Sequence, residues 1–141
     1  MSDKTFVDTN VLIYAYDVDA KVKHELAKSA LTELWSQRTG VLSMQVLQEF
    51  YVNSTRKIAK PLPKSAAQSV VSIYSGWCME TTPAEIAAAF RIEEESRISF
   101  WDALIVASAA KAGTVRILSE DLNARQIIAG VRIENPFARL T

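Results

Sequence analysis

The chain has 141 residues, of which 49% are hydrophobic, and its 16 Lys and Arg residues balance its 16 Asp and Glu residues. This length and apolar content favour a single domain, residues 1–141, with one core. The balanced charge excludes attraction of polyanions by overall charge, so any nucleic-acid contact needs local basic patches. One region is either such a patch or a solvated helix surface, and it holds Lys21, Lys23, Lys28, Arg38, Arg56, Lys57, Lys60 and Lys64.

The chain contains one cysteine, Cys78, and one histidine, His24. These exclude an internal disulfide and a zinc site of Cys and His ligands, so a metal here would need oxygen ligands. His24 is expected on the surface of an amphipathic helix. No apolar stretch approaches the roughly 20 residues needed to cross a membrane, and the first residues lack the apolar segment of a secretory signal. We therefore expect a cytoplasmic protein that does not contact a membrane.

Apolar runs alternate with helical patterns along the chain. This alternation predicts an α/β domain with a doubly wound, mainly parallel sheet of about five strands. A strand is expected over residues 4–7, a helix over 20–37 that Gly40 terminates, and a short strand over 41–43. A helix carrying Glu49 follows and ends before Pro61, because proline disfavours a continuing helix.

The second half of the chain continues the pattern with a helix over residues 64–74 and a strand near 78–81. Thr82 and Pro83 are typical of an N-cap and a first helical residue, so a helix is predicted from there to about residue 95. Residues 101–112 are apolar on nearly every side, which predicts a helix inside the domain, and Gly113 terminates it. Two further strands are expected, over 115–118 and 131–134.

Four acidic residues are candidates for one site. Asp8 directly follows the first strand, and Asp121 comes shortly after the strand that ends at Leu118. In open α/β sheets, ligands bind beyond the carboxyl ends of the strands. Asp102, at the start of the buried helix, and Glu49, in the helix after the second strand, can reach the same crevice. Gathered carboxylates repel one another and need a cation, and an all-oxygen set fits Mg²⁺ or Mn²⁺.

A metal held by carboxylates lowers the pKa of a bound water and shields a phosphate during in-line attack, so the sequence predicts phosphodiester hydrolysis. Each acid also has a structural interpretation. Asp8 and Asp102 could cap helices, and Asp121 could begin a turn. Glu49 alone could be solvated. Glu120 lies beside Asp121, and we rank it below its neighbour.

Four segments resemble motifs of the PIN-domain ribonucleases, especially the toxin subunits of VapBC-type toxin–antitoxin pairs. Residues 6–12 (FVDTNVL) and 99–105 (SFWDALI) are the more specific motifs, while residues 48–50 (QEF) and 117–122 (ILSEDL) complete the family order. The resemblance implies a PIN-like three-layer α/β/α sandwich and metal-dependent cleavage of RNA. It leaves transfer, ribosomal and messenger RNA all open as substrates.

The resemblance also implies roles for single residues and for partners. It implies that the principal metal ligands are Asp8 and Asp102, and that Glu49 and Asp121 complete the catalytic pocket. The polar residues that support the pocket are then Asn10 and Ser119. It further implies a small antitoxin that blocks the site, and a toxin homodimer.

Other functions remain as alternatives. Asp8 ends a first strand as the nucleophilic aspartate of haloacid-dehalogenase-like phosphatases does, although Asn10 stands where that family expects a second aspartate. The scattered glycines form no phosphate-binding loop, which argues against a nucleotide-binding module. A stand-alone PIN nuclease without an antitoxin and a non-catalytic interaction module on the same fold are the other two alternatives.

Overall fold

The computed structural model describes residues 3–138 and contains a five-stranded sheet in the order β2-β1-β3-β5-β4. β1 pairs in parallel with β2 and β3, and β3 pairs in parallel with β5, whereas β4 and β5 are antiparallel. The predicted mainly parallel sheet of about five strands is therefore confirmed. The strands are β1 (Thr5–Val7), β2 (Gly40–Val41), β3 (Arg116–Leu118), β4 (Ile127–Ile128) and β5 (Val131–Glu134).

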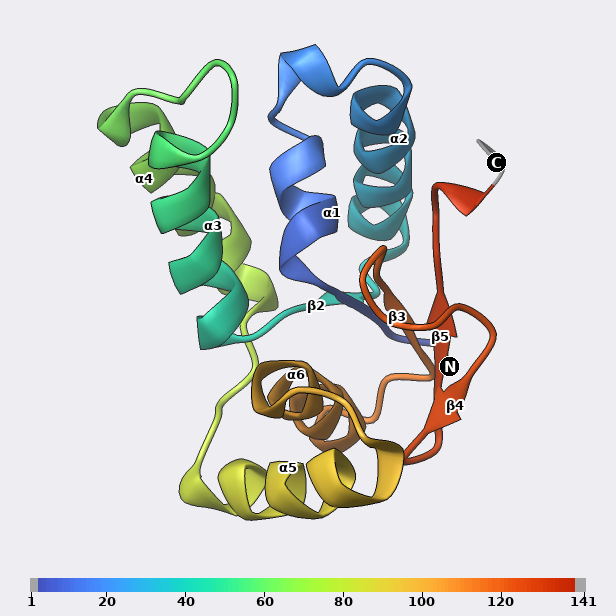
Figure 1. Ribbon diagram of the computed structural model, residues 1–141. Helices are drawn as coiled ribbons and strands as arrows, with labels where there is room; N and C mark the ends of the chain where they lie inside the picture. The colour runs from blue at the N-terminus through green and yellow to red at the C-terminus, as the bar shows by residue number, and fades with distance from the viewer. Residues whose placement is uncertain (1–2, 139–141) are drawn as a thin grey trace.

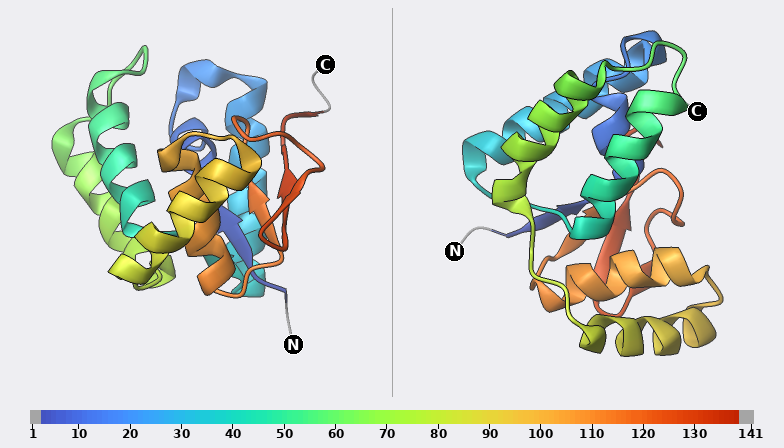
Figure 2. Two further views of the ribbon diagram at one scale, coloured as in Figure 1. Left: turned by 60° about the horizontal axis from the view of Figure 1, so that its bottom comes forward. Right: turned by 90° about the vertical axis from the view of Figure 1, so that its left-hand side faces the viewer.

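Helices lie on both faces of this sheet (Figures 1 and 2). In Figure 1, α1 and α2 lie above the sheet and α5 and α6 below it, while α3 and α4 stand beside α1. The arrangement is the expected three-layer α/β/α sandwich. The helices are α1 (Thr9–Tyr14), α2 (Val22–Gln37), α3 (Met44–Arg56), α4 (Lys64–Tyr74), α5 (Pro83–Ser96) and α6 (Phe100–Lys111), with short 3₁₀ turns at η1 (Val18–Ala20) and η2 (Ser75–Trp77). Within residues 3–138, none of the helices combines the length and the apolar character that a membrane span requires.

The central helix α6 is buried as its apolar sequence predicted. The helix packs against α5 on one side and against β3 and β5 on the other, so apolar residues are needed all round it. Ser99 is its N-cap, because the Ser99 Oγ accepts a hydrogen bond from the backbone N–H of Asp102 at 3.1 Å. Gly113, at φ 73°, follows its last turn as expected. Its buried residues are Ala103, Ile105, Val106, Ala107, Ser108 and Ala109.

The predicted helix terminator Gly40 has a different role. Arg38, at φ 58°, provides the left-handed cap of α2, and Gly40 is the first residue of β2. A Cβ atom on Gly40 would lie 2.5 Å from the ring of Trp77. The prediction that Gly40 ends the helix was therefore wrong, and the reason for glycine is the close approach of this indole ring.

The strand predicted near residues 78–81 is also wrong. Cys78 forms only an isolated parallel bridge with Leu42. The chain then turns into α5, whose start was predicted correctly: Thr82 and Glu85 form a capping box around Pro83. The partner segment ends here, because Ser43 is the N-cap of α3 and the backbone of Leu42 already uses its N–H and its carbonyl oxygen with Trp77 and Met79.

Two further features differ from the sequence-based expectation. The strand β4 was missed; it pairs with β5 through a tight turn at Ala129 and Gly130, which have φ values of 51° and 80°. His24 is partly buried rather than on the open surface, because its Nδ1 atom lies 2.9 Å from the carbonyl oxygen of Tyr14.

Candidate active site

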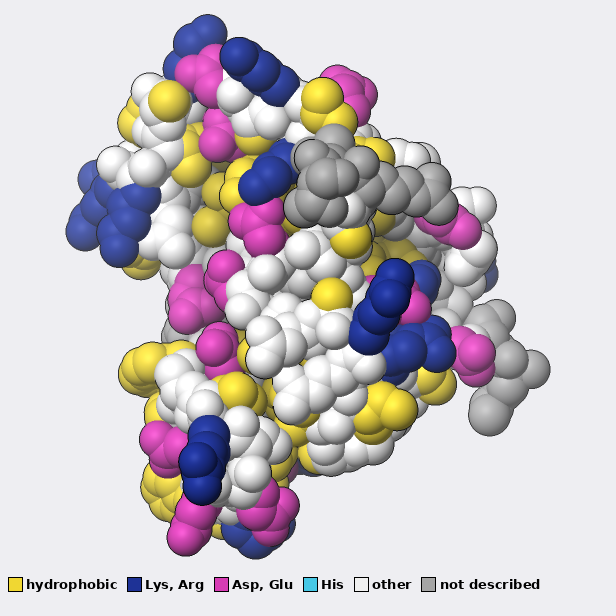
Figure 3. Space-filling view, turned by 45° about the vertical axis from the view of Figure 1, so that its right-hand side comes forward, with side chains coloured by type: hydrophobic (Ala, Val, Ile, Leu, Met, Phe, Trp, Pro, Cys, Tyr) yellow, Lys and Arg dark blue, Asp and Glu magenta, His cyan; other side chains and the backbone are white. Residues whose placement is uncertain are grey.

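The four acids expected from the sequence line one pocket of about 190 Å³. Asp8 directly follows β1, and Asp121 comes shortly after β3, so both lie at the carboxyl edge of the parallel strands. Glu49 reaches the pocket from α3, and Asp102 reaches it from the first turn of α6. Figure 3 shows acidic side chains gathered where the molecule is hollowed, between the upper helices and the α5–α6 layer. The rest of the lining consists of Thr9, Asn10, Ile13, Gln45, Asn53, Trp101 and Ile105.

Asp8 is the most deeply placed of these acids, with 5% of its surface exposed. Its Oδ1 atom accepts a hydrogen bond from the backbone N–H of Thr9 and its Oδ2 atom accepts one from the Ser119 hydroxyl, each at 2.7 Å. Asp8 therefore caps α1 and lines the pocket as well. Burial raises the pKa of Asp8 to about 6, and the charges of Asp102 and Asp121 act in the same direction, against the two hydrogen bonds.

Asp102 lies in the first turn of α6 but does not cap it, since that role belongs to Ser99. Burial raises the pKa of Asp102, and the negative charges of Asp121 and Glu49 raise it further, while hydrogen bonding with Ser99 opposes the shift. The raised pKa values of Asp8 and Asp102 show that the pocket disfavours its own negative charge. A cation would relieve both groups.

Glu49 is held in place from two sides. The Thr9 hydroxyl donates a hydrogen bond to its Oε1 atom at 2.6 Å, and the Gln45 amide donates to its Oε2 atom at 3.4 Å. The same amide also donates to the backbone oxygen of Trp101, so it links α3 to the start of α6. Thr9 is a site residue that sequence reasoning missed. No local signal could have found this role, because Thr9 begins α1 and its partner Glu49 lies 40 positions further along the chain.

Of the two neighbouring acids after β3, Asp121 faces the pocket. Its Oδ2 atom accepts a hydrogen bond from the Asn10 amide at 3.1 Å. Glu120 turns the other way, because it accepts hydrogen bonds from the Tyr14 hydroxyl at 2.7 Å and from Lys23. Asn10 also accepts a hydrogen bond from the backbone N–H of Glu120 at 3.2 Å, so it fixes the loop that carries both acids.

Ser119 is fully buried and connects this loop to the first strand. Its hydroxyl donates to Asp8 and accepts hydrogen bonds from the backbone N–H groups of Asp121 and Leu122 at 3.2 and 3.3 Å. Ser119 and Asn10 thus contact acids of the pocket, which is the supporting position that the sequence suggested for them.

The donor set fits a hydrated divalent cation. Among residues 3–138, no three Asp, Glu, His or Cys side chains are arranged to hold one ion together. Mg²⁺ does not need three, because it retains several waters and commonly binds through one or two carboxylates plus substrate phosphate. Asp8 and Asp102 line the same pocket, and the cost of their negative charges is a physical reason for a cation there.

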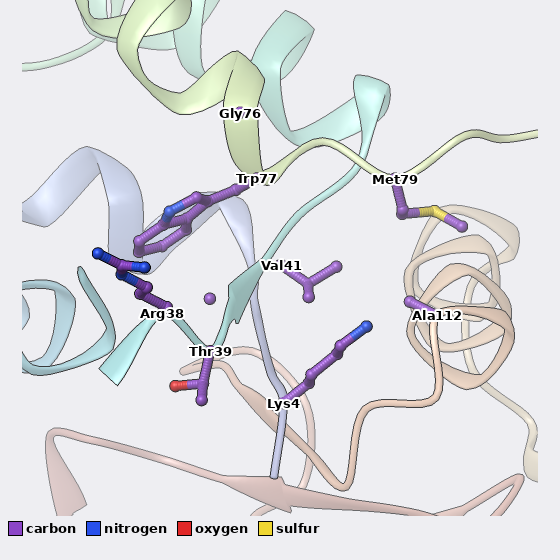
Figure 4. Close-up of a pocket in the computed structure, with 9 residues that line it drawn as sticks. Lys4, Arg38, Thr39, Val41, Gly76, Trp77, Met79 and Ala112 are labelled. Atoms are coloured by element: carbon purple, nitrogen blue, oxygen red, sulfur yellow. The ribbon is translucent and has the colours of Figure 1, made fainter. Parts of the chain in front are cut away.

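A second cavity, of about 320 Å³, lies where β1 and β2 begin, at the other end of the parallel strands (Figure 4). Lys4, Arg38, Thr39 and Trp77 contribute to its lining, and no carboxylate does. The charged ends of Lys4 and Arg38 point away from each other in Figure 4. This cavity therefore offers neither a metal site nor a convergent anion site.

The basic residues expected between positions 21 and 64 do not reach the acidic pocket. Lys23 pairs with Glu120, and Lys60 lies 3.5 Å from Asp19. No Lys or Arg of the described chain lines the acidic pocket. The acids are therefore not neutralised by protein cations at the site itself.

These features define the class of the protein as a three-layer α/β domain with an acid-lined pocket at the carboxyl ends of its parallel strands. Residues 5–129 match the PIN domain family, so the chain belongs to that family. No curated protein sequence matches the chain.

Solved structures share the fold. Mycobacterium tuberculosis VapC20, described as a sarcin-ricin loop cleaving toxin, is 21% identical with a TM-score of 0.63, over 84% of this chain and 90% of that one. DNA-bound VapBC from Salmonella typhimurium is 20% identical with a TM-score of 0.67, over 96% of this chain and 99% of that one. FitAcB from Neisseria gonorrhoeae is 18% identical with a TM-score of 0.63, over 94% of this chain and 98% of that one. The expected PIN-like α/β/α sandwich is confirmed.

Proposed function

We propose that this protein is a Mg²⁺-dependent endoribonuclease that acts as the toxin of a type II toxin–antitoxin pair. The observation that carries the proposal is the convergence of four carboxylates from separate segments on one pocket, in a chain of the PIN domain family. The structural likeness to VapC20, a toxin that cleaves the sarcin-ricin loop, supports RNA as the substrate.

Asp8 and Asp102 are the proposed metal ligands, with Mn²⁺ as an alternative to Mg²⁺. The bound ion would supply an activated water and charge neutralisation at the phosphate. Ser119 and the Thr9 N–H hold the Asp8 carboxylate in one orientation. Both hydrogen bonds lower the proton affinity of Asp8 and so favour the anionic form that a ligand must have.

Glu49 and Asp121 are the proposed catalytic partners of the two ligands. Both are acceptors within the pocket and can orient the attacking water by accepting its protons in hydrogen bonds. Thr9 positions Glu49, and Asn10 positions Asp121, so neither carboxylate has to become ordered during the reaction.

The proposal includes a small antitoxin protein that blocks the pocket, and a homodimer of the toxin. The likeness to the VapBC and FitAcB structures supports the antitoxin partner, whereas the homodimer rests on the family resemblance. A nuclease that cuts cellular RNA works in the cytoplasm, which is the expected location. A short reading frame just upstream, encoding a DNA-binding protein, would support the pairing. Without such a frame, a stand-alone PIN nuclease becomes the better description.

The test is cleavage of single-stranded RNA by the purified full chain. We expect cleavage with Mg²⁺ or Mn²⁺, loss of cleavage in EDTA, and recovery when the metal is restored. Cleavage that continues unchanged in EDTA would contradict a metal-dependent mechanism.

Two variants test the assigned ligands. Asp8→Asn and Asp102→Asn should each abolish cleavage while circular dichroism shows an intact fold, since each removes one charge with little change in volume. Glu120→Gln is the matched control. Glu120 faces away from the pocket, so this variant should keep most of the activity of the natural protein. Full activity in both aspartate variants would refute the site assignment.

The phosphatase alternative has lost support. Asn10, which stands where a second aspartate would be needed, is engaged by Asp121 and by the backbone of Glu120. The family match is also to the PIN domain. An acid-labile phosphoryl group on Asp8 would be the contrary observation.

A further inference from the structure

Trp101 is an exposed aromatic residue at the acidic pocket. It lines the pocket and yet leaves 61% of its surface exposed. It directly precedes Asp102, in the first turn of α6. A tryptophan usually contributes to stability by being buried, so an indole left in solvent beside a reactive site is free to bind a ligand.

The backbone of Trp101 and one side of its ring are held in place. Its carbonyl oxygen accepts a hydrogen bond from the Gln45 amide at 3.3 Å, which ties this turn of α6 to α3. Its ring meets the ring of Phe100 edge to face, with centroids 5.2 Å apart and planes at 72°. Phe100 in turn packs against Phe90 at 5.7 Å. The indole is therefore partly preorganised, which lowers the entropy lost on binding.

The rest of the pocket shows which ligand fits this surface. Ile13 is half-buried and adds apolar surface to the lining, whereas Ile105 is 2% exposed and adds almost none. No Lys or Arg of the described residues lines the pocket. The four carboxylates of the lining repel a phosphate, so a cation on them would favour its binding. The indole and Ile13 can hold an aromatic group directly.

We propose that Trp101 is a substrate-binding residue that stacks on a base of single-stranded RNA, next to the phosphate held at the acidic pocket. Stacking on an aromatic side chain needs an unpaired base, and it tolerates different bases because each has a flat π-face. This inference rests on the proposed ribonuclease function and adds to it a preference for single-stranded over double-stranded RNA.

The first test compares Trp101→Leu with Trp101→Phe. Loss of one stacked base should raise KM for a single-stranded RNA about 5- to 150-fold in Trp101→Leu, with a much smaller change in kcat. Trp101→Phe keeps a flat ring and should recover most of the affinity. Trp35→Leu is the matched control, since Trp35 is also a partly exposed tryptophan, at 40%, and does not line the pocket. An unchanged KM in Trp101→Leu would overturn the proposal.

The second test removes the base instead of the indole. Oligonucleotides that carry one abasic nucleotide at successive positions should show one position at which KM rises for the natural protein. The same substitution should have no further effect in Trp101→Leu, because the two changes remove one contact. Equal abasic penalties in both proteins would contradict stacking. Light scattering gives the mass of the oligomer. If Trp101→Leu forms a smaller oligomer than the natural protein and KM is unchanged, the indole contacts another protein chain, and the proposal is overturned.

Failure of the ribonuclease function is distinguishable from failure of this inference. If the natural protein cleaves no RNA with Mg²⁺ or Mn²⁺, the proposed function fails. Binding is then measured by tryptophan fluorescence, as the difference between the natural protein and Trp101→Phe during titration with a single-stranded oligonucleotide. Saturable quenching of that difference would support stacking without cleavage, and its absence would refute both ideas.

Discussion

Replacing Asp8 with asparagine is expected to stabilise the metal-free protein near neutral pH while abolishing its activity. Asp8 is buried, and burial raises its pKa from 3.8 to about 6. One pKa unit corresponds to about 1.36 kcal/mol, so ionised Asp8 costs the folded state up to about 3 kcal/mol near pH 7. Asparagine has almost the same volume and no charge, so the variant avoids this cost.

Part of the gain is lost through hydrogen bonding. The Ser119 hydroxyl donates to Asp8 Oδ2, and a side-chain NH₂ group in place of that oxygen removes an acceptor at a cost of about 1 kcal/mol. The Thr9 N–H keeps its acceptor when the amide oxygen takes the place of Oδ1. The net gain in the free energy of unfolding is therefore about 1 to 2 kcal/mol near pH 7.

The pH dependence gives the sharper prediction. Between pH 3.8 and about 6, Asp8 in the unfolded chain has released its proton while folded Asp8 retains it. The unfolded state then binds fewer protons, so the contribution of Asp8 to stability is full below this window and is lost as the pH rises through it. The asparagine variant does not share this loss, so it should be the less stable protein near pH 4 and the more stable one near pH 7.

Urea unfolding in EDTA, followed by circular dichroism at several pH values, measures this crossover. Asp3→Asn, at an exposed residue, is the control for removal of one carboxylate. Adding Mg²⁺ near pH 7 should then stabilise the natural protein and not the Asp8 variant, because only the former keeps both proposed metal ligands. A difference in unfolding free energy between the two proteins that is the same near pH 4 and near pH 7 would refute the argument.

Three further substitutions test how the site and its support are built. Thr9→Val removes the hydroxyl that positions Glu49 at 2.6 Å, so kcat should fall about tenfold with little change in stability, as measured by steady-state cleavage and urea unfolding. Glu120→Gln breaks the ion pair with Lys23 of α2 and should lower the free energy of unfolding by about 0.5 to 1 kcal/mol, as measured by thermal unfolding, while activity persists. Gly40→Ala places a methyl group 2.5 Å from the ring of Trp77 and should cost about 1 to 3 kcal/mol in urea unfolding, again without a change in cleavage chemistry.

The parts of the fold that were predictable are those that local sequence determines. The Thr82–Pro83 start of α5, the bounds of α4 and the burial of α6 all follow from capping residues or from helical periodicity within one segment. The Gly40 error depends on a contact between distant segments, because the ring of Trp77 requires glycine there and leaves no pattern around residue 40. The strand β4 has only two residues, so it is too short to show an alternation of its own, although Gly130 between two apolar runs was a local signal of its hairpin with β5.

The same division applies to the site. Asp8 and Asp121 were expected together because each follows a parallel strand, and the topology of such a sheet brings strand ends to one edge. Asp102 was expected from its position at the start of the buried helix and from its family motif together. Glu49 depended mainly on the family resemblance, since a position within a helix does not by itself give the direction of a side chain. Thr9 was missed because its partner lies forty residues away, and no local rule reports that pairing.

The choice between Glu120 and Asp121 illustrates why adjacent acids are hard to separate from sequence. Successive residues of a loop can point in either direction, and both residues carry the same charge. Tyr14 and Lys23 bind the Glu120 side chain on the far side of the loop, whereas the Asn10 amide donates a hydrogen bond to Asp121 and its oxygen accepts one from the backbone N–H of Glu120. The different partners of the two acids, which lie on α1 and α2 far from residues 120–121 in the sequence, give the two side chains their different directions.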